Sequence, residues 1–517
     1  MASEMHSLST QLLVIGGGAT GLGIAWDASL RGIKTVLVEK GDLGEGTSGR
    51  YHGLLHSGGR YVISDPISAA DCSRENMILR GIAAPAIEDT GGYFVSTPAD
   101  PHEFPDSWHS ACQQTGVPAE EIPLSQLRQR EPLLNPRISR AFQVRDGSLD
   151  SFDLSHLLAE GIRESGGKLL LRHVVTGFQL NKGHIQAAKI KSLRSAEKLT
   201  IRADFVINAA GPWAGEIAQF ANIKLPLALG KGTMLAMASR LTDTVINRCK
   251  PPADGDIIVP IGTVCVLGTT DLPVDNPDNL HIHPWELDLL LSEADILIPG
   301  IHQRRVLRAW AGIRPLYMPG EDEGASTREI TRAHRVLDHR DRDGIDNFIS
   351  VIGGKLTTFR MMAEETVDLI SHRFGNLTPC TTKTTPLPSQ RRSKYHLAER
   401  LEHLSNEPST QQDMVVCECE LITRKQLQKA LLSSDEPSLD DLRRDLRLGM
   451  GPCQAAYCGY RTAGLATEFE RGDLTFLQSF IEERWKGIRP LAWGSSLRQM
   501  ELMRRIYVEL LQLSEGF

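Results

Sequence analysis

The chain has 517 residues, 41% of them hydrophobic and 23% charged, and a formal net charge of −7. This length exceeds what one hydrophobic core fills and predicts roughly two to four domains. The negative charge argues against a nucleic-acid-binding protein, which needs a concentrated positive surface. No stretch reaches the ~18 uncharged apolar residues of a membrane-spanning helix. The apolar run at residues 12–15 leads directly into glycines, unlike a cleavable signal peptide. We therefore expect a cytoplasmic protein whose first ten residues form a disordered leader.

The N-terminal elements follow the order strand, turn, helix, strand. Residues 11–15 predict a strand, residues 22–31 a helix and residues 34–38 a second strand. The turn at residues 16–21 has the glycine spacing of the dinucleotide-binding fingerprint. This order predicts a Rossmann-type domain, but it does not distinguish NAD from FAD.

Each residue of the fingerprint has a physical role. Gly16 permits a tight turn, Gly18 lets backbone N–H groups approach a pyrophosphate, and Gly21 lets the helix pack closely on the strand. The helix N-terminus then faces the phosphates with the positive end of its dipole. Glu39 ends the second strand, where a carboxylate can accept hydrogen bonds from a ribose hydroxyl.

Two glycine-containing segments follow the second strand. Residues 44–50 include Thr47 and Ser48, and residues 56–61 begin with His56. These segments resemble the flavin-binding start of the glycerol-3-phosphate dehydrogenase family. The resemblance implies FAD as the cofactor, with Thr47 and Ser48 among the residues that bind it. The alternative is a glycine-rich surface loop.

Two later segments fit the same interpretation. Residues 169–175, which end at Val175, resemble the strand whose backbone meets the adenine in such flavoproteins. Residues 204–213 form an apolar strand that ends in small residues, including Ala210 and Gly211, as expected where backbone passes close to a cofactor. The FAD-binding domain is therefore predicted to be assembled from separated pieces of chain.

Four further motifs occur in order at residues 268–271, 311–316, 330–332 and 353–360. Together with the N-terminal motifs they closely resemble FAD-dependent glycerol-3-phosphate dehydrogenases over nearly the whole chain. The cysteine-bearing tail narrows the resemblance to the FAD-dependent catalytic subunit of the bacterial anaerobic enzymes. In the last motif the resemblance implies a flavin-contacting turn before a closing helix, formed by Gly353, Gly354, Leu356 and Thr357. The alternative is an ordinary glycine turn.

The charged residues of these motifs suit a phosphorylated substrate. A phosphate monoester carries nearly two negative charges, and arginine presents a planar fork to its oxygens. The resemblance places Arg314 and Arg332 at the phosphate end and Lys355 near the substrate or the flavin, with Arg60 as a weaker candidate. Oxidation of an alcohol also needs a base, and the pKa of histidine suits that role. His56 is the predicted base, unless it hydrogen-bonds the isoalloxazine ring.

The nine cysteines do not predict a disulfide framework in a cytoplasmic chain. Five are scattered singly and are expected to be plain thiols. The other four form a C-x-C pair and a C-x4-C pair near the C-terminus, which resemble a 2Fe–2S domain of the bacterioferritin-associated-ferredoxin type. A zinc site or no metal are the alternatives. The predicted cluster ligands are Cys417, Cys419, Cys453 and Cys458.

A flavin beside an iron–sulfur cluster implies that electrons leave for a protein partner rather than for oxygen. The resemblance implies oxidation of sn-glycerol 3-phosphate to dihydroxyacetone phosphate, with electrons passing to quinone. It also implies a membrane-attached iron–sulfur subunit with a second flavoprotein subunit, which hold the chain at the inner face of the cell membrane. The alternatives are an oxidase, a dehydrogenase for another hydroxy acid or phosphorylated alcohol, and a non-catalytic electron-transfer subunit.

The predicted fold class is α/β, with a D-amino-acid-oxidase-like FAD-binding domain, an antiparallel-sheet substrate domain and a small helical cysteine domain. A helical stretch is expected at residues 424–448, and an amphipathic helix at residues 497–513 packs on its own domain or docks onto a partner. The predicted ranges are 10–80, 150–230 and 345–375 for the FAD-binding domain, 81–149 and 231–344 for the substrate domain, 376–412 for a linker, 413–465 for the cysteine domain and 466–517 for a C-terminal helical segment.

Overall fold

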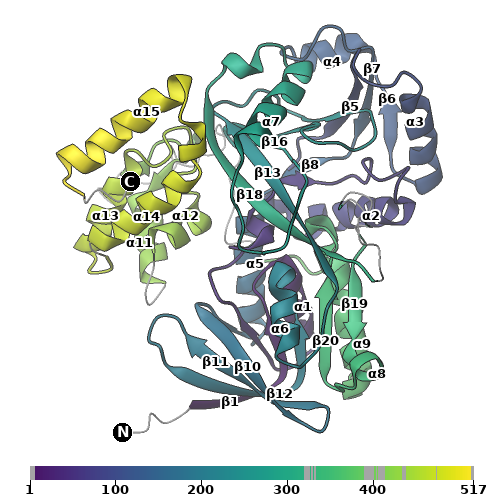
Figure 1. The fold of residues 1–517 in the computed structure, drawn as a ribbon, viewed down its shortest axis with the longest axis vertical. Coiled ribbons are helices and arrows are strands. Elements are labelled where there is room, and N and C mark those ends of the chain that lie inside the picture. The colour runs from purple at the N-terminus through teal and green to yellow at the C-terminus, as the bar shows by residue number, and fades with distance from the viewer. Residues whose placement is uncertain are drawn as a thin grey trace.

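The computed structural model arranges the chain in three regions (Figure 1). A region containing the N-terminus lies at one end, a second region carries most of the remaining strands, and the C-terminal helices form a third. Arg332 and most of the predicted linker lie outside the described residues. The residues that the structure describes are 6–319, 327, 330, 333–388, 401–402, 405, 414–433, 438–472 and 474–513.

The first region is built on an eight-stranded sheet with a parallel centre. Five strands run parallel in the order β9, β2, β1, β12 and β20, which is the Rossmann-type arrangement that the sequence predicts. These strands are β9 (Lys168–Leu170), β2 (Thr35–Val38), β1 (His6–Ile15), β12 (Lys198–Asn208) and β20 (Phe348–Ile352). The antiparallel strands β10 (His173–Asn181), β11 (His184–Ser192) and β19 (Arg335–Asp338) complete the sheet.

Helices cover both faces of this sheet because its central strands are apolar on both sides. Leu12 and Val14 of β1 enter one core, and Leu13 and Ile15 enter the opposite core. The first core lies beneath three long helices, and the second lies beneath α6. The helices are α1 (Ala19–Leu30), α5 (Ser151–Glu164), α9 (Phe359–Phe374) and α6 (Ala214–Gln219).

Three local predictions were wrong in this region. The expected disordered leader is part of β1 from His6, because β12 is 11 residues long and pairs with β1 from His6 to Ile15. The single strand expected at residues 169–175 is split between β9 and β10, since Arg172 between them has a left-handed φ of 58°. The helix expected from residue 22 already begins at Ala19.

The second region is built on a nine-stranded sheet. Its paired neighbours are antiparallel, as predicted, except that β5 and β14 run parallel. The order is β17 (Leu272–Val274), β13 (Leu227–Met237), β16 (Val264–Gly268), β15 (Ile257–Ile261), β14 (Val245–Arg248), β5 (Gly92–Ser96), β7 (Arg140–Val144) and β6 (Ala119–Glu121), with β18 (Val306–Tyr317) on β13. The long helix α7 (Pro284–Leu297) packs on this sheet.

Shorter elements surround the two large sheets. A three-stranded sheet brings together β3, β8 and β4, which come from distant parts of the chain. Its strands are β3 (Leu54–Leu55), β8 (Gly147–Leu149) and β4 (Ile87–Glu88). The remaining helices of the first two regions are α2 (Pro66–Ile82), α3 (Phe104–Thr115), α4 (Leu124–Arg130) and α8 (His339–Asp343).

The C-terminal region is helical apart from a two-stranded sheet, and it has its own hydrophobic core. The single helix expected at residues 424–448 is two helices, and Ser438 caps the second by accepting a hydrogen bond from Asp441 N at 3.1 Å. The elements are β21 (Val415–Cys417), β22 (Ile422–Thr423), α11 (Arg424–Leu432), α12 (Leu439–Leu446), α13 (Cys458–Glu468), α14 (Leu474–Lys486) and α15 (Gly494–Arg504).

The last helix packs onto its own region. Met500, Met503 and Tyr507 are buried in the C-terminal core, whereas Leu510 is 74% exposed. The amphipathic spacing is continued by a π-helical turn, Arg505–Leu510. Among the described residues, no helix combines the length and the apolar character that crossing a membrane requires.

Candidate active site and cysteine centre

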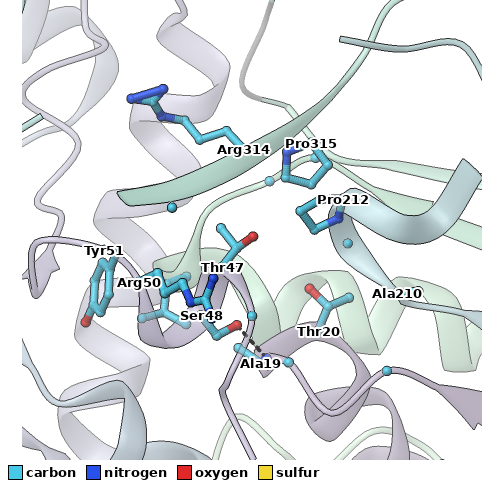
Figure 2. Close-up of a pocket in the computed structure, with 18 of the residues that line it drawn as sticks. Ala19, Thr20, Thr47, Ser48, Arg50, Tyr51, Ala210, Pro212, Arg314 and Pro315 are labelled. Carbon is cyan, nitrogen blue, oxygen red and sulfur yellow. Dashed lines mark hydrogen bonds between the residues drawn. The ribbon is translucent and has the colours of Figure 1, made fainter. Parts of the chain in front are cut away.

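A cavity of about 1000 Å³ lies between the first two regions, and the sequence motifs converge on it (Figure 2). Gly21 and Thr357 are described residues of the predicted cofactor site that are not among its lining. The predicted residues that line it are Gly16, Gly18, Glu39, Thr47, Ser48, His56, Arg60, Val175, Ala210, Gly211, Arg314, Gly353, Gly354, Lys355 and Leu356.

The glycine turn before α1 forms a cradle that side chains would fill. Gly16 has a φ of +113°, and a Cβ on it would lie 2.4 Å from the Ala209 carbonyl oxygen. A Cβ on Gly21 would lie 2.0 Å from the Gly16 carbonyl oxygen. Gly21 therefore shapes the turn without lining the cavity. Gly18 caps the helix, so the first N–H groups of α1 face the cavity.

Thr47 and Ser48 tie the loop after β2 to the cavity wall. Ser48 Oγ accepts a hydrogen bond from the Ala19 N–H at 2.9 Å, which Figure 2 marks at the start of α1. Thr47 Oγ1 donates to the Ile313 carbonyl at 2.6 Å, beside Arg314 on β18. The loop thereby connects the dinucleotide cradle to the strand that carries Arg314.

Glu39 is held at the cradle by two backbone donors. Its carboxylate oxygens accept hydrogen bonds from Gly17 N at 2.5 Å and from Gly41 N at 2.6 Å. Burial raises the pKa of Glu39, and these two hydrogen bonds oppose the shift because they favour the ionised form. The carboxylate lies where the fingerprint places an acceptor for ribose hydroxyls.

The turn after β20 holds the predicted base. Gly353 and Gly354 both have a φ of +77°, and a Cβ on Gly354 would lie 2.4 Å from the Met362 sulfur. Thr357 Oγ1, from the turn that follows, accepts a hydrogen bond from His56 N at 3.2 Å, and Asn76 Nδ2 donates to His56 O at 2.9 Å. The backbone of His56 is therefore fixed on both sides.

Arg314 lies away from the cradle (Figure 2), and Lys355 is another predicted cationic residue that lines the cavity. Arg314 donates to the Asp271 carboxylate at 2.6 Å and to Thr269 Oγ1 at 3.0 Å, which orients its guanidinium. Lys355 Nζ lies 4.2 Å from the centre of the Tyr61 ring. Arg314 and Lys355 both line the cavity, and the charge of Arg314 is paired there with that of Asp271.

His52 was missed by the sequence reasoning. It lines the cavity, and its ring lies 6.0 Å from that of His56. Burial, together with the positive charges of Arg60 and Arg314, lowers the pKa of His52 to about 3. His52 lies between the segments 44–50 and 56–61, and nothing in the sequence distinguishes it from the other 15 histidines.

Comparisons with known proteins agree on one family. Residues 11–369 match the family model described as FAD dependent oxidoreductase. The chain is 38% identical to a subunit of the anaerobic glycerol-3-phosphate dehydrogenase of Haemophilus influenzae, over 99% of this chain and 95% of that protein. It is 39% identical to a subunit of the anaerobic glycerol-3-phosphate dehydrogenase of Haloferax volcanii, over 98% and 91%.

The chain belongs to the FAD dependent oxidoreductase family. Within it, the chain belongs with the anaerobic dehydrogenase subunits named above, as the sequence predicted. The fold also matches the glycerol-3-phosphate dehydrogenase of Bacillus halodurans complexed with FAD, with a TM-score of 0.59 at 23% identity, over 92% of this chain and 82% of that one.

The cavity of this FAD dependent oxidoreductase suits its cofactor. The cradle at Gly16 leaves room that a side chain would occupy, and the α1 N-terminus offers N–H groups to a pyrophosphate. Glu39 offers a carboxylate to ribose hydroxyls. The residues present therefore fit FAD in donors, acceptors and space.

The four C-terminal cysteines lie close together. Cys417 lies beside Cys458, Cys458 beside Cys453, and Cys453 beside Cys419, close enough for neighbouring thiols to shift one another's ionisation. Interaction with these neighbours lowers the pKa of Cys417 and Cys453 and raises the pKa of Cys458 and Cys419. Among the described residues, no three His, Cys, Asp or Glu side chains already have the arrangement of a metal site.

The loop between Cys453 and Cys458 is held by buried side chains. Gln454 and Ala455 both have positive φ values, of 51° and 72°. Tyr507 Oη contacts the Ala455 carbonyl at 3.0 Å, and Arg484 donates to the Gly449 carbonyl at 2.9 Å. Such strained backbone persists where the surroundings hold it, so the C-terminal helices fix this loop.

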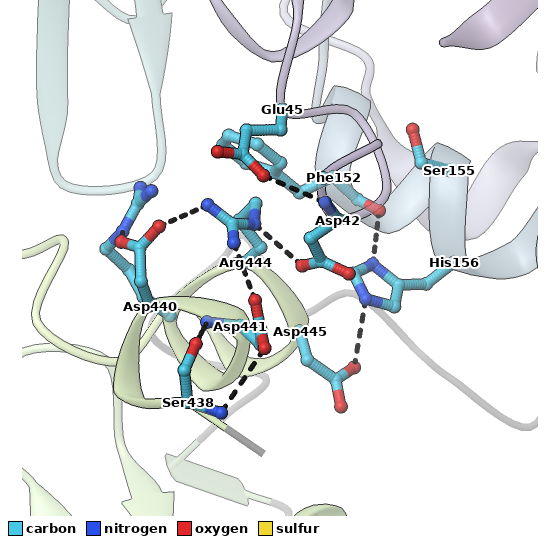
Figure 3. Close-up of polar contacts among 12 residues, drawn as sticks. Asp42, Glu45, Phe152, Ser155, His156, Ser438, Asp440, Asp441, Arg444 and Asp445 are labelled. Carbon is cyan, nitrogen blue, oxygen red and sulfur yellow. Dashed lines mark hydrogen bonds and ion pairs between the residues drawn. The ribbon is translucent and has the colours of Figure 1, made fainter. Parts of the chain in front are cut away.

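Ion pairs join the cysteine region to the loop after β2 (Figure 3). Arg444 on α12 donates to Asp42 at 2.7 Å and to Asp441 at 2.7 Å, and also pairs with Asp440. Asp42 lies between Glu39 and Glu45, which both line the cavity. This contact connects the cysteine region to the loop that carries the dinucleotide acceptor.

Proposed function

We propose that this chain oxidises sn-glycerol 3-phosphate to dihydroxyacetone phosphate. The observation that carries the proposal is the 38% identity to a glycerol-3-phosphate dehydrogenase subunit over 99% of the chain. The cavity supports it, because its lining combines a dinucleotide cradle with the cationic side chains of Arg314 and Lys355. FAD, when bound, accepts the hydride from the carbon that is oxidised.

The cofactor would be held mainly by backbone groups. Glycine turns and the α1 N-terminus surround its phosphates, and Glu39 accepts hydrogen bonds from its ribose. The closing turn before α9 presents N–H groups to the flavin, where they stabilise negative charge. The proposed set is Gly16, Gly18, Gly21, Glu39, Thr47, Ser48, Val175, Ala210, Gly211, Gly353, Gly354, Leu356 and Thr357.

The substrate phosphate would bind beside the cationic side chains. Arg314 and Arg332 present planar forks to its oxygens, and Lys355 adds a point charge. This end of the substrate is fixed first, which positions the carbon that carries the hydroxyl group. A ring nitrogen of His56 then takes the hydroxyl proton.

Electrons would leave through the C-terminal region. Cys417, Cys419, Cys453 and Cys458 would hold a 2Fe–2S cluster, which supplies one-electron chemistry. The thiol contacts described above support this proposal. The partners are a membrane-attached iron–sulfur subunit with a second flavoprotein subunit, and the final acceptor is quinone. The chain then lies at the inner face of the membrane through its partners.

The test is flavin reduction by sn-glycerol 3-phosphate in the Arg314→Ala variant, followed by stopped-flow spectroscopy without air. We expect the apparent Kd for the substrate to rise about 100-fold, since a charged hydrogen-bonding pair is lost. Arg128→Ala is the matched control, because Arg128 is exposed and donates only to the Pro136 carbonyl among the described contacts. An unchanged Kd in Arg314→Ala would contradict the proposed clamp.

A further inference from the structure

The ring of His52 is oriented by a backbone N–H group two residues further along the chain. Its Nδ1 accepts a hydrogen bond from the Leu54 N–H at 3.1 Å. A backbone amide can only donate, so Nδ1 carries a lone pair rather than a proton. In the neutral ring the proton then resides on Nε2. Nε2 makes no hydrogen bond with the described part of the chain.

The surroundings keep this ring uncharged. Arg60 and Arg314 act on it through their positive charges, and the rings of Tyr51 and His56 lie 5.7 Å and 6.0 Å away. Protonation would place a third cation beside two arginines in a buried site, and the pKa of His52 accordingly falls to about 3. At neutral pH the residue offers a single N–H donor.

The cavity determines where that donor is directed. His52, Arg60 and Arg314 all line it, and Nδ1 is already bonded to the chain. Arg60 pairs with Asp256 at 2.8 Å, and Arg314 pairs with Asp271 at 2.6 Å, so both guanidinium groups are held in place. Because both arginines act on His52 through their charges, an anionic ligand that binds beside them in the cavity would lie close to the His52 ring.

We propose that His52 is a substrate-binding residue that donates a hydrogen bond from Nε2 to the phosphate group of the substrate. This inference rests on the proposed function. It gives the two neighbouring histidines different roles, with His52 as a permanently neutral donor and His56 as the proton acceptor. Divergent environments of adjacent titratable groups commonly separate roles in this way.

The protonation state can be measured without turnover. The FAD-loaded full chain is labelled with ¹⁵N in its histidine rings, and the His52 signals are assigned as those missing from His52→Gln. We expect one ring nitrogen protonated and the other not, with no change between pH 8 and pH 5. A signal that titrates near pH 6.5, or a proton on Nδ1, would overturn the proposal.

Binding tests the donor itself, with inorganic phosphate as the probe and the visible flavin band as the readout. We expect His52→Ala to weaken phosphate binding about tenfold, because a hydrogen bond to a charged group is lost. His52→Gln, which retains an N–H donor, should stay within about threefold of the wild type. The matched control is His102→Ala at an exposed histidine.

The ratio of the phosphate affinities of wild type and His52→Gln should stay constant from pH 5.5 to pH 8. The titration of phosphate itself affects both proteins equally and cancels in this ratio. A ratio that rises below pH 6.5 would identify His52 as a cation and overturn the proposal. Equal phosphate affinity in wild type and His52→Ala would also overturn it, and would leave the proposed function intact. A wild type that binds neither phosphate nor sn-glycerol 3-phosphate would contradict both.

Discussion

The cofactor cavity and the cysteine centre are built from different parts of the chain. The cavity is a backbone structure, in which Gly16 and Gly353 take positive φ values and the α1 N-terminus supplies donors. The cysteine centre depends on four side chains, whose thiols lie beside one another in the order Cys417, Cys458, Cys453 and Cys419. The fold alone forms the first, whereas the geometry of a thiolate site is completed by its metal. The two sites should therefore fail under different substitutions.

The largest expected effect is at Gly21. A Cβ there would lie 2.0 Å from the Gly16 carbonyl oxygen, so Gly21→Ala must displace the cradle itself. We expect FAD affinity to fall at least about 100-fold, or about 3 kcal/mol. Flavin content after purification checks this. Gly81→Ala is the control, because a Cβ at Gly81 on α2 meets nothing within 4 Å, and it should retain full flavin.

Substitution in the cysteine centre should remove the cluster and leave the flavin in place. We expect Cys458→Ser to lose nearly all iron and acid-labile sulfide while keeping its flavin and its reduction by substrate, since the cavity lining does not include the cysteine loop. Iron, sulfide and flavin assays on protein purified without air measure this. Cys380→Ser, at a thiol bonded to Thr382, should keep all three. Iron retained in Cys458→Ser would refute the ligand assignment.

The contact between the two sites should affect the stability of the fold rather than the content of one site. Arg444→Met leaves Asp42, Asp440 and Asp441 without their buried partner, which costs about 3–5 kcal/mol. Urea unfolding should detect this loss. Arg461→Met, which removes an exposed pair with Glu418, should change stability by about 0.5 kcal/mol or less. Equal losses in both variants would mean that the interface contributes little.

The same contact predicts a pH dependence. Burial raises the pKa of Asp42, but the Arg444 guanidinium outweighs it and holds the pKa below its ordinary 3.8. Burial also raises the pKa of Asp440, but the positive charges of Arg443 and Arg444 outweigh burial and lower that pKa. A carboxyl group whose pKa is lower in the folded state than in the unfolded state stabilises the fold at pH values above its unfolded-state pKa. The wild-type advantage over Arg444→Met should be full above about pH 5 and shrink as pH falls below 3.8.

The smallest effects belong to the last helix. Met503 is 4% exposed and Leu510 is 74% exposed, so one represents the buried face of this helical segment and the other its exposed face. We expect Met503→Ala to cost about 2–3 kcal/mol through the cavity it leaves, and Leu510→Ser to change stability by less than about 0.5 kcal/mol. Thermal unfolding compares them. A large loss in Leu510→Ser would show that this face packs within the chain.

The sequence predicted best what backbone rules control. The glycine spacing placed the first turn correctly, because at Gly16 and Gly21 a Cβ would meet carbonyl oxygens. The apolar run at residues 11–15 predicted the strand β1, which the structure buries on both faces. Both signals depend on neighbouring residues in the sequence, so the sequence alone is enough to predict these features.

What depended on distant partners could not be predicted. His6 joins a strand only because β12 lies beside it, and the break at Arg172 reflects one left-handed residue. His52 became a candidate only when folding placed it near Arg60 and Arg314, some eight and more than 200 residues away along the chain. The roles assigned to the site residues remain predictions that the variants above will test.

The most direct test of the central claim is the visible spectrum of the wild-type chain, purified without air, before and after addition of sn-glycerol 3-phosphate. We predict that the oxidised-flavin band bleaches, and that the mirror-image sn-glycerol 1-phosphate leaves it unchanged. A flavin band that sn-glycerol 3-phosphate does not bleach, or folded protein without flavin, would contradict the account.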